Sequence, residues 1–331
     1  MIEQLEHQLS QPSPADIDAM ARLDNDLIIL GVGGKMGPTL VRRACNVSNE
    51  AGIKREIIAV SRSRPAASSA GFRHIPADLL DPSTVRRLPD AANVIYLVGR
   101  KFGSSGNEAL TWAANTVVPV LTAERYADSR IVALSTGNVY PFMSPSSGGA
   151  TEYTPLAPVG ECAQSALARE RILEYFAQEK NLRAVILRFN YAVEPSYGVL
   201  VDPTLKMLNK TPIDLTVGYV NFVWQGDANS IAIRALHYRQ SPSRVFNVTG
   251  AETHSVRTLA TPIGNASGID PVFENHESTT ALLNDSSEGR RIFGEPSGDA
   301  GECIRRTVPW LQAGGSTLGK ATHFETRSGK F

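Results

Sequence analysis

Residues 27–37 read Leu27-Ile-Ile-Leu-Gly-Val-Gly-Gly-Lys-Met-Gly37, an apolar run that passes into a glycine-rich turn. The apolar run predicts a buried strand, and the amphipathic stretch at 38–48 predicts a helix after it. In this context the spacing GxxGxxG, formed by Gly31, Gly34 and Gly37, favours a dinucleotide site. Glycines here let backbone amides and the helix N-terminus approach a pyrophosphate.

Two other glycine motifs do not fit this turn. The spacing GxGxxG read from Gly31 fails because Met36 occupies its last position. A P-loop would need glycine at position 29 and Ser or Thr at position 36, where Ile29 and Met36 stand. The alternative is a turn that only connects a strand to a helix. We expect a phosphate loop whose cofactor contacts are Gly31, Gly34, Lys35, Met36 and Gly37.

The composition is that of an ordinary globular protein. The 331 residues are 42% hydrophobic and 20% charged. At about 150 residues per domain, this length predicts two domains, or one large domain with an appendage. Lys and Arg together number 33, and so do Asp and Glu, so no net charge attracts nucleic acid or a membrane surface. We expect neither as a partner.

Cysteine use and the N-terminal sequence bear on location. Cys45, Cys162 and Cys303 are scattered and form no CxxC motif, which favours a reducing compartment. Residues 1–26 lack the basic and apolar segments of a secretory signal, and no apolar run approaches the roughly 20 residues that cross a bilayer. We expect a soluble, cytoplasmic protein. The histidines show no metal-ligand spacing, so no metal is expected.

Continuous apolar runs alternate with amphipathic stretches in the first half of the chain. Such runs are typical of strands buried on both faces, so the pattern predicts an α/β fold with a Rossmann-type, doubly wound parallel sheet. The looser pattern beyond residue 190 predicts a smaller C-terminal α/β substrate cap. We expect an N-terminal helical extension at 1–25, a dinucleotide-binding domain at 26–190, and a cap and tail at 191–331 with some segments returning to the sheet. Predicted strands are 27–32, 57–60, 94–98, 131–135 and 184–187, and the main predicted helices are 38–48, 110–127 and 162–178.

The residues after the second predicted strand indicate which dinucleotide binds. An acidic residue there would accept bonds from a ribose 2'-hydroxyl, but the sequence reads Ser61-Arg62-Ser63-Arg64. Arg62 can pair with a 2'-phosphate, and Lys35 would add a second positive charge on that side. We expect NADP to be preferred, with NAD possible. The alternative is a solvated basic loop.

Several motifs occur in the order found in one enzyme superfamily. Ala77-Asp78-Leu79 is similar to an Asp-Leu pair that contacts adenine, and residues 94–99 are similar to a fourth strand. Ser135-Thr136-Gly-Asn-Val-Tyr140 is similar to the motif Ser-Ser-x-x-Val-Tyr. Together with GxxGxxG, these motifs make the chain resemble the extended short-chain dehydrogenase/reductases, specifically the NAD-dependent epimerase/dehydratase family. The resemblance covers most of the chain.

The resemblance implies roles for individual residues. Thr136 falls at the catalytic hydroxyl position. The segment 188–190, Arg-Phe-Asn, resembles one that touches nicotinamide and substrate, so Asn190 is expected to contact substrate. The implied cofactor contacts are Asp78, Leu79, Val98, Gly99 and Phe189.

The chain departs from the family at its catalytic helix. Family members carry Tyr-x-x-x-Lys, where the Tyr hydroxyl is the general acid/base and the Lys ammonium lowers the Tyr pKa and binds the nicotinamide ribose. Here the aligned residues are Cys162 and Ala166. The sulfur of Cys162 is one bond from Cβ, several ångströms short of a Tyr hydroxyl. We therefore expect Cys162 to be a buried core thiol, and the chain to be an atypical member without Tyr-x-x-x-Lys.

The loop at 99–106 is the first place to look for a replacement. It follows the fourth predicted strand, at the sheet edge where ligands bind in open α/β folds. Lys101 is our first candidate for a relocated ammonium with a catalytic role. Ser104 and Ser105 supply hydroxyls that could contact sugar oxygens. The alternative is a basic loop that only contacts the cofactor phosphates.

Two tyrosines follow strands that should end at the cofactor. Tyr140 aligns with a family position that has no proton-transfer role, and we place it with the substrate contacts. Tyr191 follows Asn190 directly, and we place it with the catalytic candidates. For both residues, packing or substrate contact is favoured over proton transfer.

Two functions remain open from the sequence. The first is an NADP-dependent oxidoreductase or epimerase that acts on a sugar, sugar phosphate or related polyol. The second is a sensor or regulatory protein that binds the dinucleotide without catalysis. We also expect a homodimer built by the predicted helices 110–127 and 162–178. The residues expected at this contact are Ala113, Ala114, Val117, Val118, Leu121, Ala163, Ala166, Leu167 and Ile172.

Overall fold

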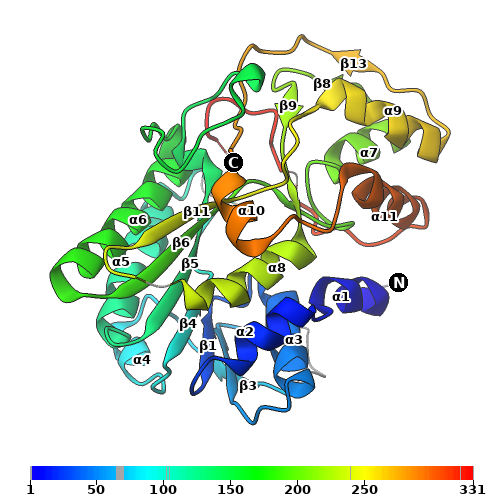
Figure 1. Ribbon diagram of the computed structural model, residues 1–331. Helices are drawn as coiled ribbons and strands as arrows, with labels where there is room; N and C mark the ends of the chain where they lie inside the picture. Colours follow the sequence, from blue (N-terminus) through cyan, green and yellow to red (C-terminus); the bar gives the residue numbers. More distant parts are fainter. Residues whose placement is uncertain are drawn as a thin grey trace.

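The computed structural model describes residues 2–64, 71–101, 103, 105–238, 240–320 and 322–330. Its central sheet has seven parallel strands in the order β11-β6-β5-β4-β1-β2-β3, with helices on both faces (Figure 1). The predicted doubly wound α/β fold is confirmed. The strands are β1 (Leu27–Leu30), β2 (Ile57–Ser61), β3 (Arg73–Pro76), β4 (Asn93–Tyr96), β5 (Arg130–Thr136), β6 (Arg183–Phe189) and β11 (Arg244–Val248).

The inner strands explain why helices cover both faces. Every residue of β1, β2 and β4 is buried, so neither face of the sheet can be left to solvent. Helices α4, α5 and α6 pack together on one face, and α1, α2, α3 and α8 pack together on the other. These helices are α1 (Ile2–Ser10), α2 (Pro14–Ala21), α3 (Gly37–Glu50), α4 (Pro82–Arg86), α5 (Glu108–Arg125), α6 (Gly160–Lys180) and α8 (Gln225–Arg234).

Strand β3 was not predicted from the sequence. It lies at the edge of the sheet, next to β2. None of its four residues is buried, so it carries no apolar run that a pattern search could find. An edge strand is held by backbone hydrogen bonds to its single neighbour, and these leave little trace in the side chains.

The segment before β1 forms two helices. Helix α2 begins with a capping box, in which the Ser13 side chain accepts from the backbone of Asp16 and the Asp16 carboxylate accepts from the backbone of Ser13. The same carboxylate pairs with Arg43 of α3, with 3.0 Å between Oδ2 and Nε. Both side chains are buried, so this pair fastens the segment to the sheet domain.

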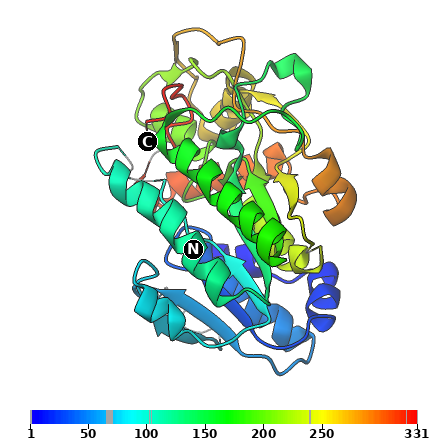
Figure 2. The same cartoon turned by 90° about the vertical axis from the view of Figure 1, so that its left-hand side faces the viewer.

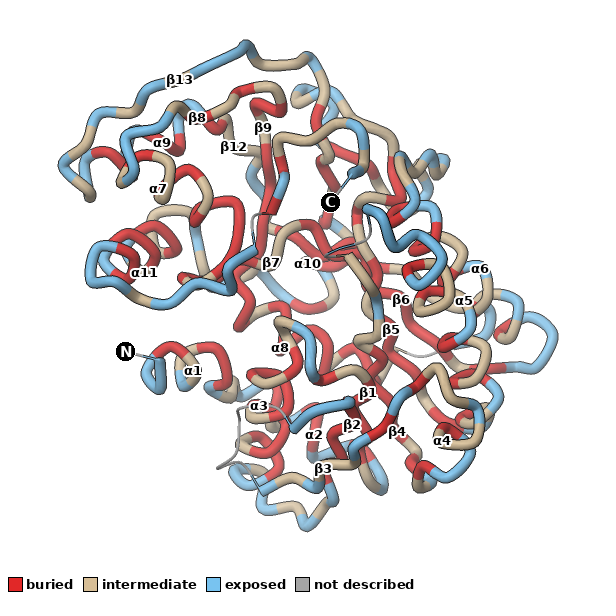
Figure 3. The backbone as a smooth tube through the Cα atoms, turned by 180° about the vertical axis from the view of Figure 1, so that it is seen from behind, coloured by how far each residue is buried: buried red, intermediate tan, exposed pale blue. Residues whose placement is uncertain are grey.

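The chain after β6 builds a second core, apart from β11, which returns to the main sheet beside β6. Helices α7, α9 and α11 pack against one another, and short strands join in pairs. Figure 3 shows buried residues both along the main sheet and in this second part. The other elements after β6 are β7 (Ala192–Val193), α7 (Val201–Leu208), β8 (Ile213–Asp214), β9 (Tyr219–Val220), β10 (Val223–Trp224), β12 (His254–Ser255), α9 (Val256–Ser267), β13 (Phe273–Glu274), α11 (Ala300–Gln312) and α10 (Ser287–Phe293), which packs on β11.

Within the described residues, no helix has both the length and the apolar character needed to cross a membrane. The carboxyl ends of β1, β4, β5 and β6 meet at one edge of the sheet, because all four strands are parallel and adjacent. In open α/β sheets this edge is where ligands bind.

Candidate active site

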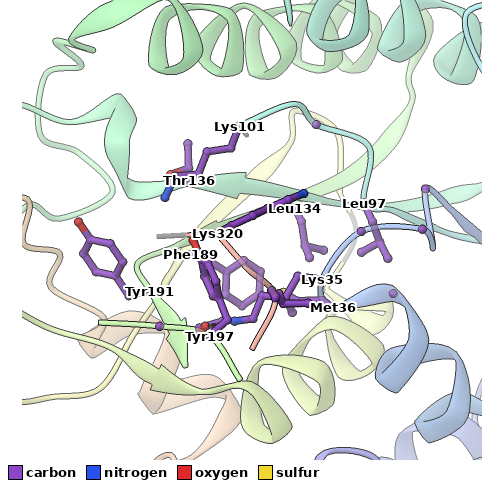
Figure 4. A pocket seen from close by; sticks show the side chains of 18 of the residues that line it. Lys35, Met36, Leu97, Lys101, Leu134, Thr136, Phe189, Tyr191, Tyr197 and Lys320 are labelled. Atoms are coloured by element: carbon purple, nitrogen blue, oxygen red, sulfur yellow. Dashed lines mark hydrogen bonds between the residues drawn. The ribbon is translucent and has the colours of Figure 1, made fainter. Parts of the chain in front are cut away.

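A cavity of about 510 Å³ lies at this edge of the sheet. The glycine turn after β1 forms one side of it, and the ends of β5 and β6 and the segment 190–198 form the others (Figure 4). It brings together most of the residues that the sequence singled out. The predicted residues that line it are Gly31, Gly34, Lys35, Met36, Gly37, Gly99, Lys101, Thr136, Phe189, Asn190 and Tyr191.

The glycine turn is built for close approach of backbone. Gly31 has a φ of +88°, and a Cβ there would lie 2.9 Å from Cγ2 of Val98. A Cβ at Gly37 would lie 2.1 Å from the carbonyl oxygen of Val32. Neither position accepts a side chain, so the turn presents bare backbone to the cavity just before α3 begins. This cradle fits a dinucleotide pyrophosphate.

Lys35 points in a different direction from the one we expected. Its ammonium donates to the carbonyl oxygen of Ala192 and lies 4.5 Å from the centre of the Tyr197 ring. Burial lowers the Lys35 pKa to about 8, although nearby Glu194 acts in the opposite direction. Both contacts belong to the segment after β6, so Lys35 faces that part of the molecule. The expectation that Lys35 supplements Arg62 at a 2'-phosphate is therefore wrong.

Several predicted cofactor and substrate residues lie outside the cavity lining. Arg62 and Asp78 are exposed, and the Asp78 carboxylate accepts from the backbone N–H of Leu80 at 3.0 Å. Leu79 is buried, and Val98 packs against the glycine turn. Ser105 is exposed and does not line the cavity, and Ser104 lies outside the described residues.

Lys101 and Thr136 extend into the cavity from neighbouring strand ends (Figure 4). The Lys101 ammonium lies 3.3 Å from the carbonyl oxygen of Thr322. Burial lowers the pKa of Lys101, while Cys162 and two nearby carboxylates act against this shift. Thr136 ends β5, and its hydroxyl accepts from the backbone N–H of Asn138 at 3.2 Å. The Thr136 hydroxyl hydrogen can therefore still donate to a ligand.

Tyr191 lines the same cavity and is held in a strained backbone conformation. Its φ is +43°, which is uncommon for an aromatic residue and typical of sites where the surroundings fix the chain. Burial raises the pKa of Tyr191, and Glu325 and Asp202 raise it further. A phenol in this setting keeps its proton, so Tyr191 suits a hydrogen-bond donor better than a base.

Tyr140 does not line the cavity. Its hydroxyl donates to Oδ1 of Asn247 at 2.9 Å and accepts from Nη1 of Arg188 at 2.7 Å. Arg188 also pairs with Glu170 at 2.6 Å, and all of these side chains are buried. Burial raises the pKa of Tyr140 to about 12. The contacts favour packing for Tyr140, in a network that joins β5, β6, α6 and β11.

Asn190 does line the cavity, but its side-chain amide already donates two hydrogen bonds within the protein. Nδ2 donates to the carbonyl oxygen of Leu282 at 3.0 Å and to Oδ1 of Asn221. These bonds attach the end of β6 to the segment before α10. Phe189 precedes it and contributes an apolar wall.

A family model described as the NAD dependent epimerase/dehydratase family matches residues 27–196. The chain belongs to this family. It is therefore an NAD-binding enzyme of the epimerase/dehydratase type. A search of curated proteins found no match.

Several solved structures share the fold. MoeE5 in complex with UDP-glucose and NAD has a TM-score of 0.73 at 18% identity, covering 88% of this chain and 99% of MoeE5. The UDP-glucose 4-epimerase of Thermotoga maritima, solved with UDP-glucose, has the same score and identity, with coverages of 87% and 99%. A putative epimerase from Burkholderia cenocepacia has a TM-score of 0.71 at 21% identity, with coverages of 88% and 99%.

In this member of the epimerase/dehydratase family, the two positions that we aligned with the Tyr and Lys of Tyr-x-x-x-Lys lie on α6, and both are buried. Cys162 is 7% exposed, and its sulfur lies 3.5 Å from the carbonyl oxygen of Arg100. Burial raises the pKa of Cys162, which works against thiolate formation. Ala166 packs in a small cluster with Tyr140. Neither residue lines the cavity, and the contacts agree with a core thiol at Cys162.

Sequence reasoning missed Arg169, which lies one helical turn after Ala166. Its guanidinium is 5% exposed, and Nη1 donates to the carbonyl oxygen of Val98 at 3.2 Å and to Oδ1 of Asn115 at 3.1 Å. Its Nε has no hydrogen-bond partner among the described residues. A Cβ at cavity-lining Gly99 would lie 2.7 Å from Nη1, so the guanidinium lies directly behind the cavity wall.

The signal for Arg169 was available in the helix geometry. Side chains of an α-helix lean toward its N-terminus, so a residue at position 169 covers the surface above position 166. With alanine at 166, a long cationic side chain three residues later can occupy that space. The family motif directed attention to the missing Lys and away from its neighbour.

Proposed function

We propose that this enzyme prefers NADP and oxidises or epimerises a sugar, sugar phosphate or related polyol, with Lys101 as the general acid/base. The observation that carries the proposal is the cavity itself. Lys101 and Thr136 extend from the ends of adjacent strands into the space that the dinucleotide loop borders. The neighbouring structures described with UDP-glucose support a sugar-like substrate.

The cofactor would be held by backbone and by cations. The glycine turn would take the pyrophosphate, and Phe189 and Gly99 would border the nicotinamide end. Arg62, which follows β2, would pair with a 2'-phosphate. When bound, the oxidised nicotinamide supplies an acceptor for hydride. The hydride would come from the carbon atom whose hydroxyl loses its proton to the protein.

Lys101 is suited to take that proton. An amine must be neutral to act as a base, and burial lowers the pKa of Lys101 toward the range where the neutral form is populated. Thr136 would donate its hydroxyl hydrogen to the reacting oxygen, and Tyr191 would donate a second hydrogen bond from its protonated phenol. In the reverse direction the Lys101 ammonium returns the proton to the oxygen.

Arg169 would supply the positive charge that the missing Lys carried. Its guanidinium has two neutral oxygen partners and an unused Nε, directly behind Gly99. Ribose hydroxyls or a phosphate on the cavity side of this wall would satisfy the remaining donors. In this arrangement Lys101 would take the proton-transfer role of the family's Tyr, and Arg169 would take the cofactor-binding role of its Lys.

Two further features complete the proposal. We infer a homodimer through the outer surfaces of α5 and α6, which lie side by side (Figure 2).

The three cysteines are free and buried, and this supports a reducing, cytoplasmic location.

Turnover assays test the proposal directly. Sugars, sugar phosphates and polyols are incubated with NADP⁺ while nicotinamide absorbance is followed, and isotope exchange detects epimerisation that leaves no net redox change. We expect turnover that Lys101→Met lowers roughly 10²- to 10⁴-fold and that Ser105→Ala, an exposed control outside the cavity, leaves unchanged. Silence in both assays, with NADPH bound, would instead favour the binding-protein alternative.

A further inference from the structure

The C-terminal segment, residues 314–320 and 322–330, crosses between the two parts of the molecule. It leaves α11 with Gly315 packed on the Trp310 ring, and the backbone N–H of Leu318 donates to Ser196 at 3.1 Å. Near its end, Gly329 packs against Val159 at the start of α6. The segment therefore begins on the cap and ends on α6, over the edge of the sheet that holds the cavity (Figure 1).

Specific contacts hold this segment in place. The backbone N–H of Thr322 donates to the Asp202 carboxylate at 2.8 Å, and the Thr322 hydroxyl donates to the same oxygen. Phe324 is 5% exposed and belongs to the apolar core of the cap. Arg327 donates to the Thr280 hydroxyl at 2.7 Å, and its guanidinium lies 4.1 Å from the centre of the Phe142 ring. Polar, apolar and cation–π contacts thus fix its course.

The segment forms part of the cavity wall. Leu318 and Lys320 both line the cavity, and the Lys320 side chain extends into it beside Leu134 (Figure 4). Two residues later, the Thr322 carbonyl accepts from the ammonium of Lys101. A substrate that reaches Lys101 must therefore fit beneath this crossing.

The segment also contributes to a second hollow, of about 200 Å³. Phe324 and Glu325 line it, whereas Leu318 and Lys320 line the main cavity. The charged groups that line the second hollow are three carboxylates and one ammonium, from Asp202, Asp214, Glu325 and Lys206. This balance repels phosphate groups.

We propose that the C-terminal segment sets the substrate size, so that the site accepts a free sugar, sugar phosphate or polyol and excludes sugars that carry a nucleoside diphosphate. A nucleotide sugar is larger than the sugar site, so on this proposal the segment would leave no room for its nucleoside, and the acidic hollow nearby would oppose its phosphates. The inference rests on the proposed function. It departs from the structural neighbours that hold UDP-glucose.

Titration calorimetry on the full chain saturated with NADP⁺ tests the exclusion. We expect UDP and UDP-glucose to show no saturable binding at millimolar concentration. Saturable binding of either probe would overturn the proposal. Failure of NADP⁺ itself to bind would count against the proposed function instead, so the two outcomes are distinguishable.

A second measurement tests the wall without any need for activity. Cys162 is two residues from Gly160, on which Gly329 packs, and its thiol interacts with Lys101, whose ammonium donates to Thr322. We therefore expect the seated segment to shield this thiol. In the double variant Thr322→Val/Arg327→Ala, which keeps the Phe324 anchor, we expect a bulky thiol reagent to modify Cys162 at least ten times faster. Mass spectrometry identifies the modified cysteine.

The matched control is Thr317→Val/Lys330→Ala, which changes exposed residues of the same segment. It should react at the rate of the unmodified chain. Equal rates in the control and in the Thr322→Val/Arg327→Ala variant would show that the segment does not cover the site. Circular dichroism on both variants verifies that a faster rate does not come from unfolding.

Discussion

Nη1 of Arg169 lies 3.1 Å from Oδ1 of Asn115, and this contact joins α6 to α5 directly behind the cavity wall. Asn115 in turn donates from Nδ2 to the hydroxyl of Ser165 at 2.8 Å, so its amide is held in one orientation. The guanidinium is thus fixed by neutral groups. This arrangement gives the proposed cofactor role of Arg169 a direct test.

Arg169→Met should weaken NADPH binding about 10- to 100-fold, since a hydrogen bond to a charged group contributes about 1.5–3 kcal/mol. Arg169→Lys keeps the charge and should restore part of this affinity. Titration calorimetry gives the affinities, and thermal unfolding without cofactor measures the structural cost separately. Unchanged affinity in Arg169→Met, with or without lost stability, would leave Arg169 a purely structural residue.

Arg62→Ala should weaken NADPH binding at least tenfold and leave NADH binding unchanged. The reason is that only NADPH carries the 2'-phosphate with which Arg62 would form charge-assisted hydrogen bonds. Arg64→Ala is the matched control, because Arg64 is also exposed and packs near the Phe72 ring. Equal affinity of the unmodified chain for NADPH and NADH would remove the basis for the preference.

The sequence predicts the sheet domain well because its information is local. Continuous apolar runs specify β1, β2 and β4, and the glycines at 31 and 37 are required by contacts within a few ångströms of the turn. Strand β3 was not predicted, because its side chains are not buried and only backbone pairing with β2 holds it.

The site was harder to predict because its contacts are long-range. The Lys101 ammonium meets Thr322, which is 221 residues further along the chain, and Lys35 meets Ala192 over a separation of 157. No spacing or motif encodes such contacts. The direction of Lys35 was therefore assigned wrongly, and the part played by the C-terminal segment was not anticipated.

The proposed dimer can be tested on the outer surface of α5 and α6. Leu110 and Val117 are each 41% exposed and Tyr175 is 54% exposed, so large apolar side chains do face outward. Part of the predicted contact is wrong, because Val118, Ala163 and Ala166 are buried inside the fold.

Val117→Asp should convert a dimer to a monomer, since a buried charge at a contact is strongly unfavourable. Light scattering at micromolar concentration gives the mass. The control is Val272→Asp, at a similarly exposed valine outside α5 and α6, which should keep the dimer. A monomer mass for the unmodified chain would rule the dimer out.

Cys162→Ala should leave turnover nearly unchanged. Its thiol is buried against the Arg100 carbonyl, and its raised pKa keeps it protonated. Loss of a true general acid/base costs roughly 10²- to 10⁴-fold, so a catalytic thiol would be unmistakable in kcat. A loss of that size would mean that the thiol reaches the substrate.

The pH profile tests Lys101 as the base. Burial lowers its pKa, so the neutral amine appears at a lower pH than for an exposed lysine. Oxidation of the substrate needs this neutral form, so its kcat should rise with pH and level off above the pKa of Lys101. Reduction needs the ammonium, so its kcat should fall over the same interval.

Lys101→Met should lose roughly 10²- to 10⁴-fold in kcat and flatten both profiles. Thr136→Ala should lower kcat but keep the inflection, because the hydroxyl only donates a hydrogen bond. Retention of the inflection in Lys101→Met would assign the proton transfer to another group.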